Sequence, residues 1–286
     1  MIPVRLPLEQ TDPPRSPQET LPTMYDLPSE DPEEPGLPDE FHLWQAELLS
    51  QTFCPPTYPP ERVFIASDLN LYYDPLNTGW YKRADWFAVV GVSRLYQGQD
   101  LRLSYVLWQE GVRPIVVIEL LSPGTQEEDL GRREPQGKQP GKWKVYEQIL
   151  GVPYYITFNR YNDELQAFQL VGNRYQAMEL LAGRIWMPDL ELGCSLWQGE
   201  YRGVLRQWLR WYDAQGNWVP TEAERERQQK ELAQQQAEQA QQQVEQERQQ
   251  RELSERRADQ ERQQRELSEQ RVEELAQRLR ELGFEP

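Results

Sequence analysis

The feature that most limits the fold of this chain is its last stretch, Thr221–Leu282, which contains neither proline nor glycine. Most of its residues are Gln, Glu, Arg or Ala, which form helices readily. Thr221 and Glu224 have the spacing of a capping box at a helix start. We therefore expect residues 221–286 to form one long helix.

An internal repeat in this helix bears on how copies of the chain associate. The segment Arg248–Arg257 (RQQRELSERR) recurs as Arg262–Arg271 (RQQRELSEQR), which is an offset of two heptads. One position of a heptad seam holds Val244, Ala258, Val272 and Leu279, and the other holds Ala233, Ala240, Leu275 and Leu282. Charged residues enter the same seam at Glu247, Arg251, Glu261 and Arg265. The pattern favours a coiled coil that makes a homo-oligomer, with its support near the end of the helix, at Val272, Leu275, Leu279 and Leu282, and little elsewhere. The alternative is a single solvated helix held by Glu–Arg pairs.

Acidic charge is concentrated at the two ends of the chain. Residues 1–40 are rich in Pro, Glu and Asp and should form an extended or disordered arm. The formal charge is −16, with −8 in residues 1–44 and −5 in residues 221–286, which leaves −3 for residues 45–220. The middle region is therefore close to neutral, and a nucleic-acid partner is not excluded by charge.

Residues 41–220 have the pattern of one α/β domain. Helices are expected at Phe41–Phe53 and Gly141–Leu150, and a last helix at Trp197–Tyr212. The two most apolar strand candidates are Ala84–Val90 and Ile115–Leu121. Further strands are expected at Val63–Ala66, Asp68–Asp74, Tyr154–Phe158, Glu164–Val171 and Tyr175–Leu181. This order predicts a mixed central sheet flanked by helices.

The chain has no pattern typical of export or membrane insertion. Cys54 and Cys194 are far apart and fit neither a disulfide framework nor a zinc site. The first residues are broken by prolines, and the longest aliphatic run, Ile115–Ile118, is too short to span a bilayer. We expect a cytoplasmic protein with no membrane partner.

Two acidic residues occupy unusual settings. Glu119 lies among apolar residues of a strand, and Asp85 opens another strand. A carboxylate buried in this way is costly unless it is paired, hydrogen-bonded or bound to a metal. A lone glutamate could also face water at the strand's end or pair with an arginine. Two carboxylates on adjacent strands can share Mg²⁺, and a nearby lysine can stabilise charge on a phosphate.

These residues resemble a known pattern. Arg83-Ala-Asp85-Trp, Val116-Val-Ile-Glu119-Leu-Leu-Ser122-Pro-Gly-Thr125, Asp129, Lys142-x-x-x-Tyr146 and Gly151-Val-Pro-Tyr-Tyr155 are similar to the Uma-type restriction endonucleases of bacteria. That family belongs to the PD-(D/E)XK nuclease superfamily. The resemblance covers roughly residues 41–181. It implies a restriction-endonuclease-like fold, Mg²⁺, a DNA substrate, and Asp85 and Glu119 as metal ligands.

One departure from the superfamily pattern concerns the position of the catalytic lysine. Leu121 stands two residues after Glu119, where the superfamily has Lys, so Lys142 becomes the best candidate for the catalytic lysine. Lys144 is second, because the helical period points it away from Lys142. Further candidates for the site are Glu47, Ser122, Asp129 and Tyr146.

Two hypotheses of function follow. The first is an Mg²⁺-dependent endonuclease that hydrolyses DNA, with Asp85, Glu119 and Lys142 as catalytic residues. The second is a catalytically inactive scaffold or interaction protein that keeps the nuclease fold and oligomerises through its C-terminal helix.

Overall fold

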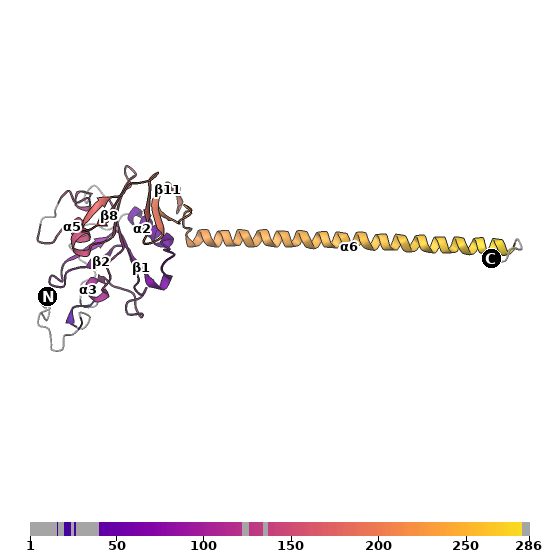
Figure 1. The fold of residues 1–286 in the computed structure, drawn as a ribbon, viewed down its shortest axis with the longest axis horizontal. Helices are drawn as coiled ribbons and strands as arrows, with labels where there is room; N and C mark the ends of the chain where they lie inside the picture. Colours follow the sequence, from indigo (N-terminus) through magenta and orange to yellow (C-terminus); the bar gives the residue numbers. More distant parts are fainter. Residues whose placement is uncertain are drawn as a thin grey trace. The chain divides into compact units, whose positions relative to one another are not determined.

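The computed structural model describes residues 16, 20–23, 26, 40–121, 126–133 and 137–281. The chain divides into two compact units, residues 1–221 and residues 222–286. The first unit is an α/β fold, and the described residues of the second form a single helix (Figure 1). Among the described residues, no helix is both long enough and apolar enough to cross a membrane.

The main sheet has six strands in the order β1-β4-β6-β7-β8-β9. Their bounds are β1 Val63–Ala66, β4 Trp86–Val90, β6 Val116–Leu120, β7 Tyr154–Asn159, β8 Glu164–Val171 and β9 Arg174–Ala177. Strands β6 and β7 are parallel, and the other neighbours are antiparallel. The expected mixed central sheet is therefore confirmed.

Two smaller sheets complete the first unit. One is antiparallel and contains β10 (Arg184–Met187), β11 (Leu192–Tyr201) and β12 (Val204–Tyr212). The other has the order β3-β2-β5, with β2 at Leu69–Tyr72, β3 at Tyr81–Ala84 and β5 at Tyr105–Val106. Strand β3 leads directly to Asp85 and β4, so this small sheet adjoins one end of the main sheet.

Most helices of the first unit are short. The longest is α2, Glu40–Thr52. The others within the described residues 40–221 are η1 (Pro60–Arg62), α3 (Leu107–Glu110), α4 (Gln126–Asp129), α5 (Lys142–Lys144) and the π-helical turn η2 (Val145–Leu150). Elements α5 and η2 form a continuous helical segment that ends at Gly151, whose φ of 63° suits glycine.

Alternation along the central strands builds two cores, one on each face of the main sheet. Trp86, Ile118 and Ile156 belong to the core that also contains α2 residues and strand β12. Phe87, Val117 and Tyr155 belong to the opposite core, with Tyr146 of η2. Because successive strand residues point to opposite faces, Glu119 shares the face of Val117, under η2.

Helix α2 is joined to strand β12 by a buried glutamine. The Gln45 side chain accepts the Leu209 N–H and donates to the Leu209 carbonyl, both at 2.8 Å. Strand β12 is an edge strand of its sheet, and such an edge carries unpaired backbone groups. Gln45 therefore satisfies one residue of this edge and fixes the helix on it.

The expected helix at Trp197–Tyr212 is wrong, because this segment forms the hairpin of β11 and β12. The turn residues Arg202 and Gly203 have φ values of 52° and 79°. Two residues of positive φ give a turn whose twist matches paired strands. Arg202, Arg206 and Arg210 recur every four residues, a spacing that is also typical of one face of a helix. In the hairpin, however, Arg210 is buried and stacks on Trp197.

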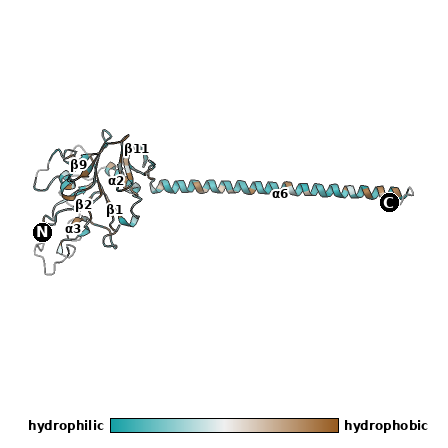
Figure 2. Cartoon of the chain, in the orientation of Figure 1, coloured by the Kyte–Doolittle hydropathy of each residue, from teal (hydrophilic) through white to brown (hydrophobic). Residues whose placement is uncertain are grey.

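The second unit is α6, which runs from Glu222 to Glu281 and comprises 60 residues. The expected long C-terminal helix is confirmed. None of its residues is buried. Figure 2, coloured by residue hydropathy, shows a mainly hydrophilic helix with separate hydrophobic bands along it. The final five residues, including Leu282 of the expected seam, lie outside the described residues.

Candidate active site

Glu119 lies in the centre of the candidate site. It is fully buried in β6, and its register partner on the parallel strand β7 is Thr157. Apolar neighbours on β6 hold the strand between the two cores, so the carboxylate has no route to bulk water along the strand. A group in this position must find its partners within the protein.

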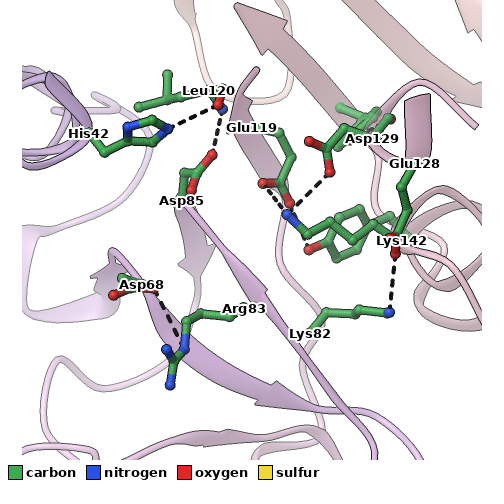
Figure 3. A network of polar contacts seen from close by, with 12 residues as sticks. His42, Asp68, Lys82, Arg83, Asp85, Glu119, Leu120, Glu128, Asp129 and Lys142 are labelled. Carbon is green, nitrogen blue, oxygen red and sulfur yellow. Dashed lines mark hydrogen bonds and ion pairs between the residues drawn. The ribbon is translucent and has the colours of Figure 1, made fainter. Parts of the chain in front are cut away.

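The main partner of Glu119 is the ammonium group of Lys142, at the start of α5 (Figure 3). Nζ of Lys142 lies 2.9 Å from Oε2 of Glu119 and 3.2 Å from Oδ1 of Asp129. The Lys142 side chain is 19% exposed, whereas those of Glu119 and Asp129 are 0% and 2% exposed. One cation therefore joins two buried carboxylates and keeps a limited path to solvent.

Two tyrosines fix the positions of these carboxylates. The Tyr146 hydroxyl donates to Oε1 of Glu119 at 2.9 Å. The Tyr155 hydroxyl donates to the backbone carbonyl of Asp129 at 2.8 Å, which ties α4 to strand β7. Lys142 and Tyr146 lie four residues apart on one helical segment, so both reach the same carboxylate.

Asp85 lies where β3 passes into β4. Its Oδ2 accepts the backbone N–H of Leu120 at 2.6 Å. Extending the antiparallel register of Trp86 with Ile118 sets Asp85 opposite Glu119. The ring nitrogen Nε2 of His42 lies 3.1 Å from the Leu120 carbonyl oxygen (Figure 3). Asp85 thus binds the backbone N–H of Leu120, the residue after Glu119, and His42 contacts the Leu120 carbonyl oxygen.

Burial and charge together set the protonation of the cluster. Burial raises the pKa of Glu119 well above its ordinary range; Lys142 opposes this shift, and Asp85 and Asp129 add to it. Burial would lower the pKa of Lys142, but the carboxylates of Glu119, Asp129 and Asp85 outweigh it and raise that pKa. Burial, followed by the charge of Glu119, raises the pKa of Tyr146. Lys142 thus stays cationic and Tyr146 stays a donor near neutral pH.

Some oxygens around Lys142 are of the kind that a hard divalent cation takes as ligands. Thr157 Oγ1 and Asp129 Oδ1 are buried and have no hydrogen bond with any described residue, although Asp129 Oδ1 contacts the Lys142 ammonium. Mg²⁺ uses oxygen ligands and is commonly held by one or two carboxylates together with water and phosphate. The Lys142 ammonium contacts two carboxylates, Glu119 and Asp129, and the charge of Asp85 acts on it as well. Within the described ranges, no group of three or more His, Cys, Asp or Glu residues is arranged to hold a metal.

Some residues predicted for the site lie elsewhere. Glu47 is on α2, and its Oε2 pairs with Nη2 of Arg202 at 2.6 Å. Lys144 is exposed. Ser122 lies outside the described residues. The structure therefore brings together Asp85, Glu119, Asp129, Lys142 and Tyr146, but neither Glu47 nor Lys144.

Sequence reasoning missed Lys82 and Thr157. Lys82 is a nearly buried residue of β3 whose Nζ lies 3.6 Å from Oε1 of Glu128. Burial lowers the pKa of Lys82, and the positive charge of Lys142 adds to this shift. The negative charges of Glu128 and Glu119 oppose it. Burial alternates along β3, but Tyr81-Lys-Arg-Ala84 does not alternate apolar and polar residues, so this stretch of sequence carries no strand signal. Thr157 had no local signal, because only the pairing of β6 with β7 places it beside Glu119.

Comparison with known proteins adds a family. Residues 15–199 match the family Uma2, whose description is "Putative restriction endonuclease". Among solved structures, a protein from Anabaena variabilis titled "putative nuclease belonging to DUF820" is 12% identical, with a TM-score of 0.35. The similarity covers 65% of this chain and 87% of that one. No curated protein matches the chain.

Proposed function

Since the chain belongs to the Uma2 family of restriction-endonuclease-type proteins, we propose that it is a Mg²⁺-dependent endonuclease that hydrolyses DNA phosphodiester bonds. The observation that carries this proposal is the buried cluster in which the Lys142 ammonium joins Glu119 and Asp129. We assign metal binding to Asp85 and Glu119 and phosphate contact to Lys142.

The position of Lys142 supports this assignment, although Lys142 comes from a helix and not from the strand that carries Glu119. The side chain two positions after Glu119 is Leu121, which is buried and is no cation. Lys142 instead brings an ammonium to Glu119 from the neighbouring helix. Electrostatic stabilisation depends on where the charge is held and not on which element supplies it. A lysine from α5 can therefore take the place of a lysine from the strand.

The proposed reaction is the attack of water on phosphorus and departure of one ester oxygen. A bound divalent cation would polarise the phosphate and favour hydroxide formation from water. Lys142 keeps its proton and would stabilise the extra negative charge on the phosphate oxygens. Tyr146 and Asp129 would act as positioning residues, because they orient Glu119 and Lys142.

The test is Glu119→Gln, which keeps the side-chain volume and removes the ionisable carboxyl group. We expect loss of Mg²⁺-dependent cleavage of linear and supercoiled DNA. Circular dichroism should show a folded protein. Glu127→Gln is the matched control, because this glutamate is exposed and lies outside the Lys142 cluster.

Calorimetry with Mg²⁺ separates the two hypotheses. Heat of binding in the wild type and its loss in Glu119→Gln would support the metal site. A parent protein that neither binds millimolar Mg²⁺ nor cuts DNA would favour an inactive scaffold with the nuclease fold. Equal cleavage by Glu119→Gln and the parent would remove the proposed site.

We also propose that α6 joins copies of the chain. Its seam carries Val272, Leu275 and Leu279 on a helix without a buried residue. An isolated helix of this composition gains little from its own apolar groups, and a second copy would cover them.

A further inference from the structure

Helix α6 exposes apolar side chains at both seam positions. Val244, Val272 and Leu275 are 67%, 66% and 55% exposed. In a two-stranded coiled coil the first seam position is a, and the second, three residues later, is d. Here the a series contains Ala237, Val244, Arg251, Ala258, Arg265, Val272 and Leu279. The d series contains Ala233, Ala240, Glu247, Ser254, Glu261, Ser268 and Leu275.

The charged layers oppose a parallel pair. In a parallel dimer, each seam residue meets the same residue of the second copy. Arg251 and Arg265 would then each lie against the same arginine of the second copy. Glu247 and Glu261 would likewise each lie against the same glutamate. Four layers of like charge would therefore lie in the centre of the interface, where desolvation adds to the repulsion.

Reversing one helix removes this conflict. In an antiparallel pair, an a residue of one copy packs at the level of a d residue of the other. If the two-fold axis passes beside Arg256, Arg251 meets Glu261 of the second copy, and Arg265 meets Glu247 of the second copy. All four charged layers become Arg–Glu pairs in one register.

The same register also matches large side chains with small ones. Leu279 meets Ala233 of the second copy, and Leu275 meets Ala237 of the second copy. Val272 meets Ala240 of the second copy by the same symmetry. The leucine-rich end of one helix thus lies on the alanine-rich beginning of the other. Each of these layers pairs a large side chain with a small one, which allows close packing.

We infer that α6 pairs with α6 of a second copy in an antiparallel coiled coil centred on Arg256. This inference rests on the proposed self-association and adds the direction and the register. At 1.5 Å per residue, the Glu222 ends of the two helices lie about 100 Å apart. On one flank of the seam, five of the eight positions are glutamine (Gln229, Gln236, Gln243, Gln250 and Gln264) and three are arginine (Arg257, Arg271 and Arg278).

Cross-linking of the full chain tests the direction. Val244→Cys and Ser268→Cys are made separately with the exposed Cys54 changed to serine, and one of the two carries a mass tag. These positions meet in the antiparallel register, whereas two copies of residue 244 lie about 36 Å apart. We expect a disulfide between the two variants when they are mixed and oxidised. A Val244→Cys protein that cross-links only with itself would overturn the inference.

Sedimentation equilibrium tests the register. The double variant Glu247→Arg, Glu261→Arg turns every Arg–Glu layer into Arg–Arg and should weaken the dimer by at least about tenfold. The double variant Glu252→Arg, Glu266→Arg makes the same charge change outside the seam and should leave a dimer. Equal dimers from both variants would overturn the register, because a parallel pair keeps four like-charged layers in either case.

A parent chain of single-copy mass would overturn both the inference and the proposed self-association. DNA cleavage is measured on the same samples, and retained cleavage leaves the proposed nuclease function intact.

Discussion

The Lys142 ammonium lies 2.9 Å from Glu119 across 23 positions of sequence, and the contact joins the start of α5 to the middle of the central sheet. A strand can place a carboxylate in the core, but it needs a second element to bring a cation to it. The helical segment α5–η2 supplies both that cation and the Tyr146 hydroxyl. The site therefore depends on how this segment packs on the sheet as much as on the carboxylates.

Lys142→Met should reduce DNA cleavage by about 100- to 1,000-fold, the usual range when one charge-stabilising donor is removed. Methionine keeps the length of the side chain and loses its positive charge. The measurement is the single-turnover rate at saturating Mg²⁺, so that weaker metal binding does not enter the result. Lys144→Met is the matched control, because Lys144 is exposed on the same helix. A similar loss in both variants would contradict a specific role for Lys142.

The two functions assigned to Asp85 can be separated by the choice of substitution. Asp85→Asn keeps an oxygen that can accept the Leu120 N–H, so it should weaken Mg²⁺ binding with little change in stability. Asp85→Ala leaves that N–H without its acceptor and should lower the free energy of unfolding by about 1–3 kcal/mol. Urea denaturation and calorimetry measure the two effects. Equal stability of both variants would show that the contact with Leu120 is unimportant.

Glu147 should make the stability of the first unit depend on acidic pH. Burial opposes its ionisation, but the Tyr175 N–H, Gln148 and Arg174 outweigh burial and lower its pKa from the ordinary 4.5. The folded state then binds fewer protons than the unfolded state between the two pKa values. The stabilisation is complete above about pH 4.5 and falls as the pH drops through the folded-state pKa.

Comparison of Glu147→Gln with the parent checks this dependence. Near neutral pH the variant should be less stable by about 1.5–3 kcal/mol, the usual contribution of a hydrogen bond to a charged group. The difference should narrow as the pH falls below 4.5. Glu179→Gln, at an exposed residue, is the control. A difference that does not change between pH 7 and pH 3 would be at odds with the lowered pKa.

Gln45 should be among the most sensitive polar residues of the first unit. Gln45→Leu removes the partners of both the N–H and the carbonyl of Leu209, each at 2.8 Å. Two unpaired buried backbone groups should lower the free energy of unfolding by about 2–4 kcal/mol. Gln51→Leu, whose native amide donates to Glu47 within the same helix, should cost much less. Thermal unfolding of both variants against the parent gives the comparison.

The central elements could be predicted because their local patterns agree with their environment. Ile115–Leu121 is apolar throughout, and β6 occupies Val116–Leu120 with both faces covered. The long helix α6 could be predicted because its residues form helices readily and include neither glycine nor proline. In these places local preference and tertiary packing favour the same structure.

The hairpin β11–β12 could not be predicted by the same reasoning. Its arginines recur with a helical spacing, whereas its aromatic residues favour strands and Gly203 favours a turn. Short strands such as β3 and β10 depend on their partners in space, which the sequence does not name. Asp85 and Glu119 could be singled out from their apolar settings. Lys82 and Thr157 could not, because only the folded sheets bring them near Glu119.

The pairing of β11 with β12 has a consequence for where this fold can be cut. The family match ends at residue 199, inside β11, whereas the ladder continues from Gly193 with Tyr212 to Tyr201 with Val204. A chain terminated at the end of the match would lose Trp208 and Trp211, which are buried beside α2. It would also leave Gln45 facing no edge strand. The smallest portion expected to fold independently therefore extends to about Thr221, beyond the region shared with the family.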